Sequence, residues 1–152
     1  MRLAFFQPDI PQNLGAAIRL TACLATPLDV IEPCAFPLND RAIDRVALDY
    51  GRGDHVRRHD SFEAFLAASP SPARLILLTT AGAMSHHGFA FGPEDILLMG
   101  SESAGASAEV HAAAAARVRI PMASGVRSFN VVTAAALALG EALRQTGQWP
   151  QT

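Results

Sequence analysis

The sequence predicts an α/β domain built on a mostly parallel β-sheet, with helices on both faces of the sheet. Two observations lead to this prediction. Strand patterns alternate with helix patterns along the whole chain, and neither an internal repeat nor a linker interrupts the alternation. The composition agrees with a globular protein, because 50% of the 152 residues are hydrophobic and 17% are charged. A chain of this length can bury its own core, so we expect a single domain over residues 1–152.

In the first half of the chain, strands are expected at residues 3–7 and 29–32, with a weaker one at 55–60. Helices are expected at residues 13–25, 40–48 and 62–68. Each of these helices has a polar residue at its start that can accept hydrogen bonds from the free backbone N–H groups of the first turn. The expected caps are Asn13, Asn39 and Ser61.

In the second half of the chain, the strongest strand pattern covers residues 74–80, and further strands are expected at 95–100 and 118–120. A glycine-bearing loop, AGAM, follows the first of these strands. Ser107 is expected to cap a helix over residues 108–116, and Asn130 to cap the alanine-rich helix that follows it.

Small and polar residues follow three of the expected strands. The three stretches are TTAG after Leu78, GSESAG after Met99 and PMASG after Ile120. In a parallel sheet, ligands bind at the carboxyl ends of the strands, so these loops are the first candidates for a binding site. None of them has the glycine pattern of a dinucleotide cradle or a P-loop, which disfavours an ATPase and an ordinary Rossmann dehydrogenase.

The candidate site residues have structural as well as functional interpretations. Arg19 shares a helix face with Gly15, which leaves room for a ligand beside the guanidinium, but an ion pair with Glu102 would also explain it. Capping alone explains Asn130, whereas it does not explain Ser128. A loop rich in hydrogen-bond donors, facing two similar loops, is suited to surround a small polar molecule.

Several classes of function are disfavoured. His86 and His87 are adjacent and lack the spacing of metal ligands, so we expect no metal site. The N-terminal apolar run is broken by Pro8 and Asp9 and is too short for a signal peptide or a membrane span, so we expect a cytoplasmic protein without membrane contact. The net charge of −2 gives no global attraction to nucleic acid, although local arginines could contact phosphates. The candidates are Arg2, Arg19, Arg41, Arg45, Arg52, Arg57, Arg58 and Arg127.

Three motifs in this order resemble those of the SPOUT methyltransferases, in particular the TrmL-like branch that methylates the wobble nucleotide of tRNA. The motifs are PDIPQNLGAAIRL, MGSESAG and RIPMASGVRSFN, accompanied by the shorter phrases VIEP, LDY and LTT. The resemblance implies a homodimer whose C-terminal part forms a deep trefoil knot. It also implies that S-adenosyl-L-methionine lies in the knot, held largely by main-chain groups of the three loops.

Residue by residue, the resemblance assigns cofactor contacts to four positions, Leu78, Gly100, Ile120 and Ser128. In the same motifs, Glu102, Met122 and Asn130 would shape the pocket or the interface. Arg19 matches the catalytic arginine that the family places beside the reacting ribose. Three positions depart from the family pattern, namely Gly51, Ala106 and Gly140.

The expected function is therefore transfer of a methyl group to the ribose 2′-hydroxyl of tRNA nucleotide 34, a cytidine or a modified uridine in the anticodon loop. Two alternatives remain at this point. One is a 2′-O-methyltransferase of ribosomal RNA, and the other is a knotted dimer that binds RNA without catalysis.

Overall fold

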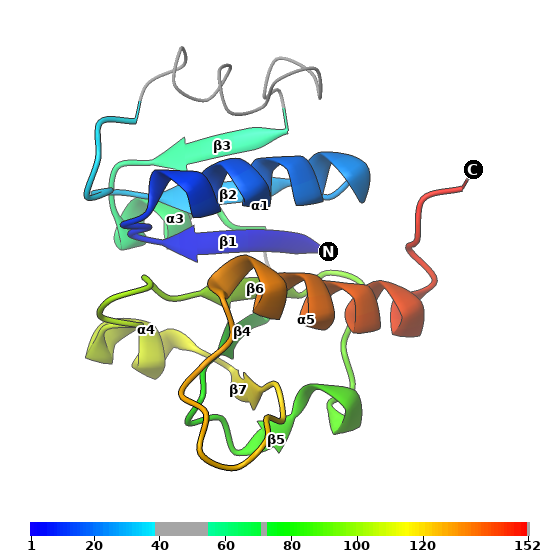
Figure 1. The fold of residues 1–152 in the computed structure, drawn as a ribbon. Helices are drawn as coiled ribbons and strands as arrows, with labels where there is room; N and C mark the ends of the chain where they lie inside the picture. Colours follow the sequence, from blue (N-terminus) through cyan, green and yellow to red (C-terminus); the bar gives the residue numbers. More distant parts are fainter. Residues whose placement is uncertain (39–54, 71–72, 152) are drawn as a thin grey trace.

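The computed structural model describes residues 1–38, 55–70 and 73–151 of the chain. In this part, seven strands form one sheet in the order β3-β2-β1-β6-β4-β7-β5 (Figure 1). Neighbouring strands are parallel in every pair, which confirms the predicted parallel sheet. The strands are β1 (Arg2–Phe6), β2 (Leu28–Ile31), β3 (Val56–His59), β4 (Leu75–Leu78), β5 (Met84–Ser85), β6 (Ile96–Met99) and β7 (Ala116–Arg119).

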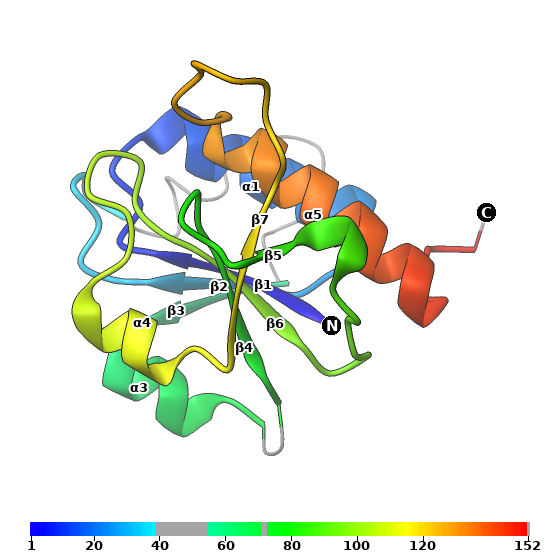
Figure 2. The same cartoon turned by 90° about the horizontal axis from the view of Figure 1, so that it is seen from below.

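Helices cover both faces of the sheet, as predicted. Helices α1 (Pro11–Cys23) and α5 (Val131–Thr146) lie on one face, and α3 (Phe62–Ala68) and α4 (Ala108–Ala113) lie on the other (Figure 2). A short 3₁₀ helix, η1 (His86–Gly88), follows β5. The helix expected at residues 40–48, with its cap Asn39, lies outside the described residues.

The central strands are apolar along their whole length, because the helices bury both of their faces. All four residues of β4 and all four of β6 are buried. Alternate side chains of these strands enter two separate apolar clusters. One cluster contains Leu97 together with side chains of α1 and α5, and the other contains Leu98 together with Phe65 of α3. The sheet is therefore the middle layer of three.

One acidic residue is buried within the sheet. Asp29 of β2 is 1% exposed, and its carboxylate accepts hydrogen bonds from Arg2 Nε at 2.8 Å and Arg2 Nη2 at 2.7 Å. A nitrogen of the His59 ring lies 2.8 Å from the same carboxylate. A buried carboxylate is tolerated when it is paired in this way. The cluster links β1, β2 and β3, and it pairs Arg2, one of the arginines expected to contact RNA, with a buried carboxylate of the fold.

Three of the expected helix caps are confirmed. Ser61 accepts a hydrogen bond from Ala64 N–H, and Ser107 accepts one from Val110 N–H. Asn130 accepts from the N–H groups of residues 132 and 133 at the start of α5. Caps of this kind satisfy backbone donors that have no partner within the helix.

The prediction that Asn13 caps the first helix is wrong. Helix α1 begins two residues earlier, at Pro11, and Ile10 stands at the cap position without a side-chain hydrogen bond. Proline is favoured at the first helical position, because its fixed φ suits the helix and the missing N–H would be unpaired there anyway. Asn13 thus lies within the first turn, and its amide is available for other contacts.

The helix predicted at residues 108–116 is too long. Helix α4 ends at Ala113, and residues 116–119 form β7 instead, paired with β4. The alanine run favours a helix locally, but pairing with a central strand of the sheet outweighs that preference. The AGAM loop also contains the start of the short strand β5, which pairs with the outer side of β7.

Candidate functional site

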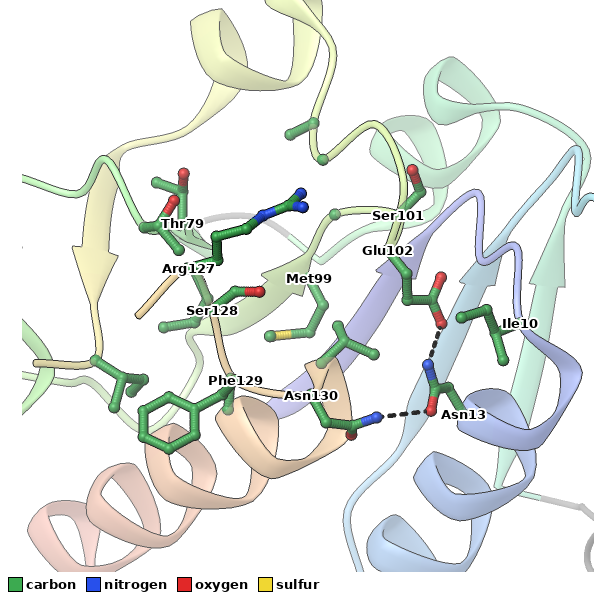
Figure 3. Close-up of a pocket in the computed structure, with 18 of the residues that line it drawn as sticks. Ile10, Asn13, Thr79, Met99, Ser101, Glu102, Arg127, Ser128, Phe129 and Asn130 are labelled. Atoms are coloured by element: carbon green, nitrogen blue, oxygen red, sulfur yellow. Dashed lines mark hydrogen bonds between the residues drawn. The ribbon is translucent and has the colours of Figure 1, made fainter. Parts of the chain in front are cut away.

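A cavity of about 560 Å³ lies at the carboxyl ends of β4, β6 and β7 (Figure 3). Its walls come from the loop after β4, from the loop after β6 (residues 100–107), from the loop after β7 (residues 120–130) and from the start of α1 and of α5. The described lining residues are Ile10, Asn13, Leu78, Thr79, Thr80, Met99, Gly100, Ser101, Glu102, Gly105, Ala106, Ile120, Met122, Arg127, Ser128, Phe129, Asn130, Val131 and Ala134.

The cavity brings together all seven residues to which the resemblance assigned cofactor contacts or a part in shaping the pocket or the interface. They are Leu78, Gly100, Glu102, Ile120, Met122, Ser128 and Asn130. They come from three segments separated by 20 or so residues each, and they meet because β4 pairs with both β6 and β7. The three loops chosen from their positions after strands therefore line one cavity.

Arg19 occupies a different position. It lies in the second half of α1, is exposed to solvent and is not among the described residues that line the cavity. Asn13, on the first turn of the same helix, does line the cavity. The guanidinium is thus presented outside the cavity, on the helix that forms part of its wall.

Two backbone hydrogen bonds close the loop after β6 into a tight turn. Ser101 N–H donates to the carbonyl of Gly105, and Gly105 N–H donates to the carbonyl of Ser101, both at 2.9 Å. Gly105 has a φ of 71°, a conformation that glycine adopts without strain. A Cβ atom on Gly100 would lie 2.5 Å from the carbonyl carbon of Gly105. Only glycine at position 100 permits this close approach of backbone to backbone.

A chain of hydrogen bonds, which we call the amide link, joins the loop after β6, α1 and α5 (Figure 3). Asn130 Nδ2 donates to Asn13 Oδ1 at 2.9 Å, and Asn13 Nδ2 donates to Glu102 Oε1 at 2.8 Å. The other oxygen of Glu102 accepts from the backbone N–H of Asp9 at 3.0 Å. Glu102, considered above as an ion-pair partner of Arg19, is thus held by two N–H donors. The amide link fixes one wall of the cavity.

The two roles of Asn130 can be separated by substitution. Asn130→Ala should lower the free energy of unfolding by about 1 kcal/mol, because the cap of α5 is lost. Asn130→Asp keeps an oxygen for the cap but removes the N–H donor to Asn13, so its unfolding free energy should stay close to that of the unchanged protein. Urea titration of the three proteins measures both values. Equal destabilisation by the two substitutions would show that the bond to Asn13, and not the cap, matters for stability.

Asp9 completes the attachment of the loop after β6. Its carboxylate accepts from the backbone N–H groups of Glu102 at 3.2 Å and Ser103 at 3.1 Å, and from the Ser103 hydroxyl. The interaction with the Glu102 side chain and the hydrogen bonds from Ser103 lower the pKa of Asp9 from 3.8 to about 2. These contacts favour the ionised carboxylate in the folded protein.

The lowered pKa of Asp9 predicts how its contribution to stability depends on pH. A depressed pKa in the folded state stabilises the fold above pH 3.8, and this contribution disappears as the pH falls towards 2. Asp9→Asn should therefore be less stable than the unchanged protein at neutral pH, and the difference should shrink between about pH 4 and about pH 2. Urea unfolding over this range tests the prediction. A difference that stays constant with pH would contradict it.

Sequence reasoning missed some of the cavity wall. Ile10, Thr79 and Phe129 line it, and so does Asn13, which the sequence had indicated only as a cap. Each of these residues lies inside a stretch that the sequence did single out, so membership of those stretches was the available signal. Among the described residues, no group of three His, Cys, Asp or Glu side chains is placed to hold a metal ion. None of the described helices combines the length and the apolar character that crossing a membrane requires.

Comparison with known proteins gives consistent matches. The model of the SpoU rRNA Methylase family matches residues 1–140. A tRNA (cytidine(34)-2'-O)-methyltransferase of Beijerinckia indica subsp. indica is 51% identical over 146 residues, which are 95% of this chain and 91% of that protein. The similarity thus extends over nearly the whole length of both chains.

Solved structures agree with the family match. One, described as "Structural insights into the 2-OH methylation of C/U34 on tRNA", has a TM-score of 0.87 and 41% identity, covering 95% of this chain and 94% of that one. The SpoU methyltransferase AviRb from Streptomyces viridochromogenes, in complex with the cofactor AdoMet, has a TM-score of 0.82 and 27% identity. That match covers 95% of this chain and 60% of AviRb.

Proposed function

The chain belongs to the SpoU rRNA methylase family, and from this premise we propose that it is a tRNA 2′-O-methyltransferase. It transfers a methyl group from S-adenosyl-L-methionine to the ribose 2′-hydroxyl of nucleotide 34, a cytidine or uridine. The observation that supports this most is the meeting of three distant motifs in one cavity at the carboxyl ends of β4, β6 and β7. The similarity to a methyltransferase of tRNA cytidine 34 supports the choice of substrate.

The cavity suits S-adenosyl-L-methionine. Its volume of about 560 Å³ falls within the range of small-molecule sites. Apolar side chains such as Leu78, Met99 and Ile120 offer a surface for a flat base, and backbone groups of the three loops offer hydrogen bonds. We assign the cofactor contacts to Leu78, Gly100, Ile120 and Ser128, with Glu102, Met122 and Asn130 shaping the pocket. When bound, the cofactor supplies an electrophilic methyl group on its sulfonium.

Arg19 is assigned the catalytic role at the ribose. The guanidinium keeps its proton at neutral pH, so it is unsuited to removing the proton of the 2′-hydroxyl. A fixed cation can instead stabilise the negative charge that develops on the ribose oxygen, or hold a phosphate that does so. Its exposed position on α1 leaves it accessible to an RNA that approaches from outside the cavity.

A homodimer is part of the proposal. Several of the exposed large apolar side chains lie at the start of α1, in the loop after β7, in α5 and directly after α5. They are Ile10, Val126, Phe129, Leu137 and Trp149, each between 41% and 57% exposed. An apolar surface of this kind is suited to a second copy of the chain. A dimer would also supply a larger surface to an anticodon loop than one chain offers.

Three further features belong to the same proposal. One SPOUT domain spans residues 1–152, and its C-terminal part, from β6 to α5, forms a deep trefoil knot. The protein acts in the cytoplasm, where its tRNA substrate is found. Family membership supports the knot, and the parallel sheet with helices on both faces is compatible with it.

The experiment that tests the function has two stages. Isothermal titration with S-adenosyl-L-methionine is followed by tritium transfer from the labelled cofactor to bulk tRNA, with mapping of the methylated nucleotide. Binding and transfer to nucleotide 34 are expected. Binding without transfer to any RNA would support a non-catalytic dimer. Transfer to ribosomal RNA alone would show that the substrate is ribosomal RNA and not tRNA.

A further inference from the structure

The charges on the cavity wall are few. Of the described residues that line the cavity, Glu102 and Arg127 are the two that carry a charge. Both oxygens of Glu102 already accept hydrogen bonds, from Asn13 Nδ2 and from the backbone N–H of Asp9. The Arg127 guanidinium makes no hydrogen bond or ion pair with any described residue, and its side chain points into the cavity from the loop after β7 (Figure 3).

Six other arginines in the described part of the chain are engaged within the protein. Arg2 pairs with Asp29, Arg58 with Glu32, Arg74 with Asp95 and Arg144 with Glu141. Arg117 and Arg119 donate to backbone carbonyl groups. Arg127 therefore differs from them in having five N–H donors that face a cavity and lack an acceptor in the protein.

The residues that follow Arg127 attach its loop to the cavity wall. Ser128 lines the cavity directly after it, and Asn130 is anchored twice, as the cap of α5 and through Asn13. The backbone that carries Arg127 thus ends at an anchored residue three positions later. The anchored backbone keeps Arg127 at the cavity, while its guanidinium has no hydrogen-bond partner among the described residues.

We propose that Arg127 binds the carboxylate at the amino-acid end of S-adenosyl-L-methionine. This inference rests on the proposed function. The cofactor carries one negative group, its carboxylate, beside a sulfonium and an ammonium. Arg127 is the one cation among the described lining residues, and a guanidinium can pair with a carboxylate through two parallel hydrogen bonds. Arg127 thus distinguishes S-adenosyl-L-methionine from a related compound that lacks the carboxylate.

The test compares two cofactors and two substitutions. The affinity of the protein for S-adenosyl-L-methionine and for decarboxylated S-adenosylmethionine is measured by isothermal titration for the unchanged protein, for Arg127→Gln and for Arg144→Gln. Arg144 is the matched control, because it is an exposed arginine of α5 that does not line the cavity. Because Arg127 is exposed and makes no hydrogen bond or ion pair with a described residue, its substitution should leave the melting temperature unchanged.

We expect Arg127→Gln to weaken the binding of S-adenosyl-L-methionine about ten-fold, and that of the decarboxylated compound by less than about two-fold. Arg144→Gln should leave both affinities unchanged. Equal weakening for both cofactors would overturn the assignment. It would also be overturned if cofactor affinity were unchanged and the affinity for tRNA fell, since Arg127 would then contact an RNA phosphate. Failure of the unchanged protein to bind either cofactor would instead refute the proposed function.

Discussion

Arg19→Ala should lower the rate of methyl transfer to tRNA by about 100-fold or more, the loss typical for removing one group that stabilises charge in a transition state. The affinity for S-adenosyl-L-methionine should change by less than about two-fold, because Arg19 is not among the described residues that line the cavity. Single-turnover transfer of a tritiated methyl group measures the rate. Isothermal titration measures the affinity of the same preparation.

Two further variants sharpen this result. Arg19→Lys keeps the charge but not the planar fork of donors, so it should retain an intermediate rate if the fork positions a phosphate or an oxyanion. Arg144→Ala removes an exposed arginine from α5 and should leave the rate unchanged. If Arg19→Ala turned over like the unchanged protein, the catalytic assignment would be lost. If Arg19→Ala also lost affinity for S-adenosyl-L-methionine, Arg19 would contribute to cofactor binding and not to the reaction at the ribose.

Gly100→Ala should disrupt the cofactor site, because the added methyl group would clash with the main chain of the loop after β6. The new Cβ would lie 2.5 Å from the carbonyl carbon of Gly105, 2.8 Å from its oxygen and 2.9 Å from the nitrogen of Ala106. These atoms belong to the main chain and cannot rotate away as a side chain can, so the loop after β6 must move. Overpacking of this kind lowers the free energy of unfolding by about 1–3 kcal/mol. Affinity for S-adenosyl-L-methionine should fall at least about ten-fold, since this loop carries two of the assigned residues, Gly100 and Glu102.

Gly88→Ala is the matched control for this substitution. A Cβ on Gly88 would meet no atom within 4 Å, and Gly88 is not among the glycines with a positive φ. Its urea midpoint and cofactor affinity should therefore equal those of the unchanged protein. Retention of full affinity by Gly100→Ala would mean that the loop after β6 can open without loss of the site.

The apolar strands were the part of the fold that local sequence could predict best. β4 and β6 are short runs of Leu, Ile and Met, and such runs are expected when helices cover both faces of a strand. The polar caps Ser61 and Ser107 likewise marked helix starts correctly, because a cap acts on N–H groups only a few residues away. In both cases the interaction that decides the structure is local.

The wrong predictions all involve partners that are distant in sequence. Asn13 is a good cap by residue type, but its amide bonds to Glu102 and Asn130, which lie 89 and 117 residues away. The alanine run of residues 112–116 favours a helix, yet its last residue, Ala116, belongs to β7 and pairs with β4. Neither contact leaves a periodic pattern in the sequence. Both contacts form only when the sheet brings distant segments of the chain together.

The site was partly predictable in the same sense. Loops after Leu78, Met99 and Ile120 were indicated by strand ends, and the cavity lies where those loops meet. The individual cofactor contacts came from family resemblance, since spacing alone did not distinguish Ser128 from its neighbours. Arg127 was indicated only as one of eight arginines that could contact RNA. Its lack of a partner within the described protein is visible only in three dimensions.

The amide link has a consequence for how the protein is made. It joins residue 13 to residue 130, which a ribosome adds 117 residues later. Residue 130 must therefore be synthesised before the wall built by Asn13, Glu102 and Asn130 can form. A nascent chain that has not reached residue 130 has no complete pocket for the methyl donor.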